Sequence, residues 1–206
     1  MTGDTVRFTS YRSLGGRERL FCTTRIWEAA RATSAAFTFF DPIIIGDFQE
    51  SFVDGAIGAN NPVYEVWNEA QDIWPSDSSK VNDRCLVSIG TGVPSLKPFG
   101  NTLISVGQIL LTIATETEKT AERFLLDKSK LDETGRYYRF NVLGLGDIGL
   151  EESNRKSQII AATDMYIASQ AVYRQMKAFA ALRLELYDTL SHMKSEVRFL
   201  RCVASL

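Results

Sequence analysis

Residues 51 to 70 read SFVDGAIGANNPVYEVWNEA, and the predictions of the fold and of the functional site both depend on this stretch. The stretch contains one aspartate, Asp54, which follows the apolar pair Phe52-Val53 and precedes Gly55. The pattern predicts a short strand, a tight turn, and then a helix that starts at Asn61 and Pro62, because Asn is a favoured N-cap and Pro a favoured first residue. An aspartate in this place is either a turn former or a carboxylate held rigidly at the mouth of an active site.

The segments around this stretch alternate between strand-like and helix-like patterns. Strand-like runs are expected at 6–11, 43–45, 52–53, 84–92 and 136–142, with a turn at Gly46-Asp47 between the second and the third. The continuous apolar run within 84–92 is typical of a parallel strand that is buried on both faces. Helical periodicity is expected from Thr23 or Thr24 to Pro42, over 101–130, and from Ser157 to about Leu190. The alternation predicts an α/β fold, layered around a mainly parallel sheet. Asp54 would then lie at the carboxyl edge of that sheet, where open α/β folds gather their ligands.

Composition excludes several classes of function. The 206 residues carry 25 acids and 23 bases, a net charge of -2, and the bases form no stripe, so nucleic acid is not an expected partner. Three widely spaced cysteines and one histidine match neither a disulfide framework nor a zinc site, so we expect no metal. Neither a signal peptide nor a membrane-spanning run is evident, which predicts a cytoplasmic protein and leaves peripheral membrane contact open.

One motif suggests a different activity. Residues 144–149 read GLGDIG, which matches the glycine pattern of dinucleotide-binding folds. The next 40 or so residues, however, have helical periodicity and no second strand that ends in an acid. The βαβ unit that gives the motif its meaning is therefore missing, and we interpret the segment as a connection.

Four segments, taken in order, point to a known family. They are IWEAARATSAAFTFF, FVDGAIGANNPVYEVWNEA, CLVSIGTG and YYRFNV. Together they resemble the patatin-like phospholipases, especially the fungal forms, over roughly residues 6 to 180. The resemblance implies a layered α/β/α fold and hydrolysis of lipid acyl esters by a Ser-Asp dyad, without a cofactor. By position in the family's D-G-G/A motif, it assigns the catalytic acid to Asp54, with Gly55 and Ala56 completing the motif.

The other half of that dyad has no counterpart here. The family's nucleophile sits in a G-x-S-x-G turn, and no serine of this chain has that surrounding sequence. We therefore expect residues 1–190 to be the C-terminal part of a patatin-like domain, incomplete at its N-terminus, with 191–206 as a tail. Its expected partners are a phospholipid or other acyl lipid and the missing N-terminal half of the domain. The alternative is a catalytically inactive, lipid-associated or interaction fragment.

A carboxylate base also makes physical demands on its surroundings. Free aspartate is a weak base, so burial beside Phe52 and Val53 is expected to raise the pKa of Asp54 and make it more effective. Gly55, which has no side chain, is expected to let the main chain approach the serine closely.

Overall fold

A computed structural model describes residues 4–36, 39–74, 85–93, 106–145, 148–149 and 152–193, without the side chains of 57, 106–115 and 183–193. The chain divides into two compact units, Met1–Ser76 with Arg201–Leu206, and Asp77–Leu200. The expectation of one domain over 1–190 followed by a tail stays a prediction.

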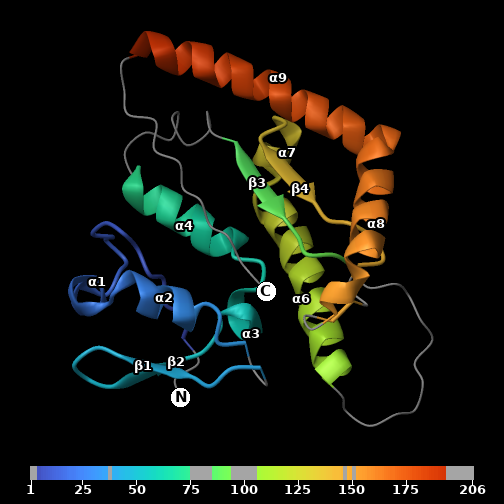
Figure 1. The fold of residues 1–206 in the computed structure, drawn as a ribbon. Helices are drawn as coiled ribbons and strands as arrows, with labels where there is room; N and C mark the ends of the chain where they lie inside the picture. Colours follow the sequence, from blue (N-terminus) through green and yellow to red (C-terminus); the bar gives the residue numbers. More distant parts are fainter. Residues whose placement is uncertain are drawn as a thin grey trace. The chain divides into compact units, whose positions relative to one another are not determined.

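The first unit is a β-hairpin with short helices around it (Figure 1). Its elements are α1 (Glu18–Thr23), α2 (Ile26–Ala32), β1 (Ile43–Ile45), β2 (Glu50–Phe52), α3 (Ala56–Ala59) and α4 (Val63–Ile73). β1 and β2 pair antiparallel, with Ile44 opposite Ser51. A four-residue turn joins them, and its first residue, Gly46, has a φ of 77°, a conformation that glycine adopts without strain.

A small apolar core holds α1, α2 and the hairpin together. Leu20, Ala32 and Ile45 are buried at its centre. Phe8 and Phe52 pack against them, with ring centroids 5.3 Å apart in an edge-to-face arrangement. The N-terminal segment therefore joins the core through its side chains, although its expected strand at 6–11 is wrong, since the segment pairs with no described strand.

The helices of this unit differ from the expected ones at their ends. Thr23 and Thr24 finish α1 instead of capping α2. The N-cap of α2 is Arg25, whose N–H donates to the carboxylate of Glu28 at 2.7 Å. α2 then ends at Ala32, well before Pro42, because the chain leaves the helix to bury Ala35 completely. α4 begins at Val63, one residue later than expected.

In its described residues, the second unit contains a parallel strand pair with helices around it (Figure 1). Its elements are β3 (Leu86–Ile89), α6 (Val106–Asp127), α7 (Ser129–Glu133), β4 (Tyr137–Phe140), the 3₁₀ turn η1 (Ser153–Arg155), α8 (Lys156–Ala168) and α9 (Gln170–Met193). β3 and β4 run parallel, with Leu86 opposite Tyr137. The sequence left open one long helix or two shorter ones over 101–130. In the described part, from 106 on, α6 is a long helix that ends at Asp127 and is followed by the short α7, and together they make the crossover that parallel strands require.

Helices pack on both faces of this strand pair. Tyr137 and Tyr138 are neighbours in β4, so their side chains point to opposite faces. Tyr137 contacts Phe124 of α6 at a centroid distance of 5.2 Å, and Tyr138 contacts Phe179 of α9 at 5.3 Å. Helices thus contact both faces of this small parallel strand pair, which is compatible with an α/β fold, and the layered α/β/α arrangement stays a prediction.

Two expectations about the sheet need correction or stay open. The apolar run in β3 was expected to be buried on both faces, but Ile89 is 76% exposed. Among the described strands one pair is parallel and one antiparallel, so the mainly parallel sheet stays a prediction. No helix in the described part of the chain is both long enough and apolar enough to span a bilayer.

Candidate functional site

Asp54 is held by main-chain hydrogen bonds on both sides. Its own N–H donates to the carbonyl of Ala35 at 3.0 Å, which ties it to the segment after α2. Its Oδ1 accepts the N–H of Ala56, the first residue of α3, at 2.8 Å. The residue is only 6% exposed. The carboxylate is therefore fixed in place at the carboxyl end of β2, although that strand belongs to an antiparallel hairpin and not to a parallel sheet.

The two carboxylate oxygens of Asp54 have different surroundings. Oδ1 makes the short-range bond to Ala56 that is typical of a turn-forming aspartate. Oδ2 is buried and has no hydrogen-bond partner among the described residues. Burial raises the pKa of Asp54, while the Ala56 N–H bond, which favours the charged form, opposes the rise. One oxygen thus forms the turn, and the other is available to accept a proton.

Gly55 is needed neither for its backbone conformation nor for packing within the described residues. Its φ of -68° is an ordinary right-handed value that any residue adopts. A Cβ added there would meet nothing within 4 Å. The expected close approach of another segment is therefore not seen in the described chain, and it stays a prediction.

A buried ion-pair cluster holds the N-terminal segment on α4, the helix that follows Asp54 and α3. Arg7 lies 3.0 Å from the carboxylate of Glu69, which is 5% exposed, and reaches Glu65 and Asp72 at 3.8 and 3.9 Å. The Tyr11 hydroxyl donates to the same Glu69 at 2.9 Å. Burial, together with Glu69, raises the pKa of Tyr11 to about 12. Arg7, Tyr11 and Glu69 are thus engaged with one another, although Oε2 of Glu69 has the ion pair with Arg7 and no hydrogen bond of good geometry, and we interpret the cluster as structural.

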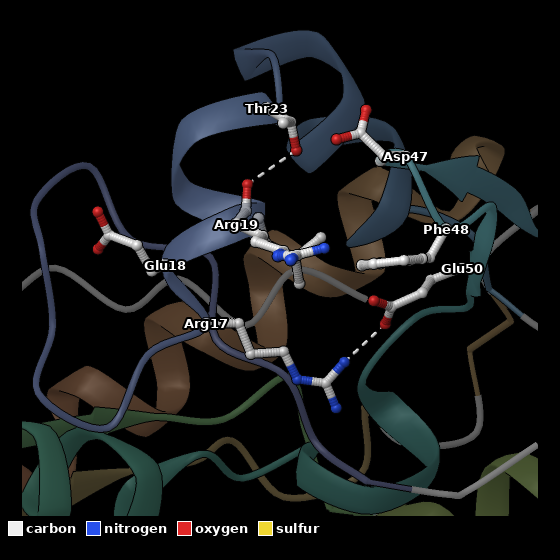
Figure 2. A pocket seen from close by; sticks show the side chains of 9 residues that line it. Arg17, Glu18, Arg19, Thr23, Asp47, Phe48 and Glu50 are labelled. Atoms are coloured by element: carbon white, nitrogen blue, oxygen red, sulfur yellow. Dashed lines mark hydrogen bonds and ion pairs between the residues drawn. The ribbon is translucent and has the colours of Figure 1, made fainter.

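A cavity of about 300 Å³ lies between α1 and the hairpin turn (Figure 2). An ion pair of 2.6 Å between Arg17 and Glu50 crosses it, and Arg19 lies over the Phe48 ring at 4.8 Å. Its charged lining residues are Arg17, Glu18, Arg19, Asp47 and Glu50, a net charge of -1. Asp54 does not line this cavity, and the two arginines of the cavity already contact Glu50 and Phe48. We therefore do not assign a catalytic role to the cavity.

A polar network in the second unit was missed by the sequence analysis. Glu118 of α6 accepts hydrogen bonds from Arg139, at 2.5 Å, and from Asn141, at 2.8 Å. The Oδ1 of Asn141 in turn accepts the N–H of Gly92 at 2.8 Å. A Cβ on Gly90 would lie 2.4 Å from the end of the Asn141 side chain, so a larger residue there would displace Asn141 from its hydrogen bonds to Glu118 and Gly92. The glycines of SIGTG therefore pack against Asn141. In the sequence, the only feature that could have pointed to Asn141 is its position directly after the strand β4.

No metal-binding cluster occurs in the described ranges, where no three His, Cys, Asp or Glu side chains are grouped to hold an ion. The arrangement at Asp54 instead suits proton transfer, because it offers one fixed, partly desolvated carboxylate oxygen.

No family model matches this chain. It is 37% identical over 122 residues to phospholipase A I of Arabidopsis thaliana, a match covering 58% of this chain and 9% of that protein. It is 30% identical over 150 residues to the calcium-independent phospholipase A2-gamma of Mus musculus, covering 70% and 17%. It is 37% identical over 71 residues to the cGAMP-activated phospholipase of Vibrio cholerae, covering 32% and 19%.

The matched regions are thus between 9 and 19% of the lengths of these three relatives. The relatives come from a plant, a mammal and a bacterium, and each is named as a phospholipase. The chain is therefore similar to part of several phospholipases.

Proposed function

We propose that this chain is the acid-bearing part of a patatin-like lipid acyl hydrolase, in which Asp54 is the general base of a Ser-Asp dyad. The observation that carries the proposal is the asymmetry of the Asp54 carboxylate. Oδ1 is fixed by Ala56, while Oδ2 is buried without a partner. Similarity to three phospholipases supports the lipid ester as the substrate class.

The proposed reaction moves one proton through Oδ2 of Asp54. A serine hydroxyl donates its proton to Oδ2 while its oxygen attacks the ester carbonyl carbon and forms a tetrahedral intermediate. The intermediate collapses, the bond to the leaving alcohol breaks, and Asp54 returns the proton to that oxygen. Water then attacks the acyl-serine and gives a proton to Asp54; the bond to the serine oxygen breaks, Asp54 returns the proton to that oxygen, and the fatty acid is released. The raised pKa of Asp54 suits this role, because it makes the carboxylate a stronger base.

The serine of this dyad is proposed to lie outside the 206 residues. No serine here has glycines two positions before and after it, as the nucleophile turn requires. The open space beside Gly55 leaves room for a segment that brings the serine to Asp54. In-frame sequence upstream of Met1 tests this point: a G-x-S-x-G motif supports the enzyme, and an early stop codon supports the inactive fragment.

We further propose that the substrate is a phospholipid or another acyl lipid, and that neither a metal nor another cofactor takes part. The relative from Mus musculus is named as calcium-independent, and we extend that property to this chain. Added chelator should therefore leave the activity of the complete protein unchanged.

A fluorophosphonate probe, read by intact mass, tests the dyad, because the probe reacts with activated serines only. We expect no labelling of the 206-residue chain, and one equivalent on a product that includes the upstream serine turn. In that longer product, Asp54→Asn should slow both labelling and phospholipid hydrolysis by about a hundred-fold or more, the usual contribution of a general base.

Asparagine is the matched variant for this experiment because it retains an oxygen to accept the Ala56 N–H while removing the base. Hydrolysis at the wild-type rate by Asp54→Asn would overturn the proposal. Stoichiometric labelling of the 206-residue chain itself would show that one of its own serines is activated, and would refute the placement of the nucleophile elsewhere.

A further inference from the structure

Asp54 depends on the segment after α2 for one of its main-chain contacts. Its N–H donates to the carbonyl of Ala35, which lies three residues beyond the end of that helix. The described residues of this segment, 33–36 and 39–41, form neither helix nor strand. Irregular segments open more easily than helices and strands do, because fewer contacts hold them. The position of the Asp54 main chain therefore depends on what fixes this segment.

Arg31, in the last turn of α2, ties the far end of the segment back to the helix. Its Nη2 donates to the carbonyl of Asp41 at 2.7 Å. The guanidinium also lies over the ring of Phe40, 5.3 Å from the ring centroid. The side chain thus closes a loop between residues 31 and 41, and Ala35, which is completely buried, belongs to that loop.

Arg31 differs from an ordinary surface arginine, which pairs with a nearby acid. It forms an ion pair with no described residue. Its Nη1 is buried and has no hydrogen-bond partner within the described ranges. A buried donor without a partner costs free energy, and the cost is greater for a charged group. The contacts that hold the guanidinium are therefore the Asp41 carbonyl and the Phe40 ring.

We propose that Arg31 is a positioning residue for Asp54. It fixes residues 39–41 against α2 and so fixes the loop that carries the Ala35 carbonyl, which in turn holds the N–H of Asp54. Arginine suits this role better than lysine, because its planar guanidinium stacks on an aromatic ring while its edge donates hydrogen bonds. The inference rests on the proposed function, in which Asp54 must be held in place as the base.

Arg19 provides a matched control in the same unit. Its guanidinium lies over the ring of Phe48 at 4.8 Å, much as that of Arg31 lies over Phe40. It belongs to α1 and contacts the hairpin turn, so it takes no part in the loop that contains Ala35. Arg19→Met therefore removes the same chemical group, from the same kind of contact, without acting on that loop.

Amide hydrogen exchange on the 206-residue chain, read by NMR, tests the inference. Arg31→Met retains an unbranched side chain but removes the charge and the donors. In this variant the Asp54 N–H should exchange at least about ten-fold faster than in the wild type, the effect expected from loss of a hydrogen bond to a charged group. The reference is the Val66 N–H, which donates to the Pro62 carbonyl at 2.9 Å and should change much less. Arg19→Met should leave the ratio of the two rates unchanged.

The pKa of Asp54, followed through its carboxyl carbon signal, is a second readout. Asp54→Asn lacks this signal and so identifies it. Burial raises the pKa of Asp54 above 3.8, so a carboxylate that regains water in Arg31→Met should have a lower pKa. Loss of the positive charge alone would raise the pKa, so the sign separates the two effects. Arg31→Lys, which keeps the charge, should also lower the pKa.

Two results would overturn the role of Arg31. One is an unchanged or raised pKa of Asp54 in Arg31→Met. The other is equal acceleration of the Asp54 and Val66 amides, or of neither, since Arg31 would then support the whole unit or nothing. If Arg31→Met does not fold, the same measurements on Arg31→Lys decide. No hydrolysis is measured here, so the dyad and the role of Arg31 fail separately.

Discussion

Replacement of Asp54 by asparagine should stabilise the first unit at neutral pH. The substitution retains an oxygen for the Ala56 N–H and removes a charge whose Oδ2 is buried without a partner among the described residues. A buried polar group without a hydrogen bond costs about 1 to 3 kcal/mol, and more when charged. Because the new amide nitrogen also lacks a partner, we expect the lower end, a gain of about 1 kcal/mol in the free energy of unfolding at pH 7.

The stability that Asp54→Asn gains over the wild type should increase as the pH rises. Burial raises the folded-state pKa of Asp54 above its ordinary value of 3.8, so the protonated acid favours the folded chain. The stability that protonated Asp54 contributes is fully present below pH 3.8, and it is lost as the pH rises through the folded-state pKa. Asparagine does not titrate. The stability difference between the two proteins should therefore be small at pH 3 and grow toward pH 7.

Urea denaturation of both proteins between pH 3 and pH 7 measures this difference, and the titration of all other groups cancels in the comparison. Asp54→Ala is the control for the turn. It loses the bond to Ala56 and should be less stable than Asp54→Asn by about 1 kcal/mol, as for a lost helix cap. A difference that stays constant with pH, or an asparagine variant less stable at pH 7, would mean that Oδ2 is paired in the folded chain and would refute the assignment.

Three other predictions follow from the packing. Gly90→Ala should destabilise the second unit by about 1 to 3 kcal/mol in urea denaturation, because its Cβ would lie 2.4 Å from the Asn141 side chain; an unchanged midpoint contradicts this contact. Arg7→Met should cost about 2 kcal/mol in the same assay by leaving Glu69 buried without its cation, and a neutral effect would show that the cluster is solvated. Burial raises the pKa of Cys85 to about 11, so little of the reactive thiolate is present at pH 8. With the other cysteines changed to serine, alkylation of Cys85 by iodoacetamide should therefore be very slow at pH 8. Rapid reaction would show that the thiol is open to solvent.

Local sequence chemistry was sufficient to predict most of the elements. The triple isoleucine at 43–45 and the aromatic run at 137–140 are strands, as their β-branched and aromatic content predicts. The apolar periodicity of 106–127 likewise predicted α6. The ends of elements were less predictable: α2 ends at Ala32, ten residues before the expected Pro42, because burying Ala35 is a tertiary effect with no local signal.

The sequence did not predict which strands share a sheet or what covers them, for a similar reason. Hydrophobic pattern shows that a segment is a strand, but the partner is chosen by contacts between distant residues. The two short strands expected on either side of the Gly46-Asp47 turn form the hairpin of β1 and β2, and among the described strands the one before Asp54 has an antiparallel partner and no parallel one. The β3 strand, expected to be covered on both faces, leaves Ile89 exposed.

The sequence by itself made Asp54 the candidate acid, because the motifs around it resemble those of patatin-like phospholipases, whereas an aspartate before a glycine at a strand end is by itself most often a turn former. It left open whether that acid forms a turn or a site. Only the tertiary structure shows where each oxygen lies: Oδ1 accepts the Ala56 N–H, as in a turn, and Oδ2 is buried where no described group meets it, which supports the proposed role as a base. Burial and the presence of hydrogen-bond partners are properties of the folded chain, and no local pattern of residues encodes them.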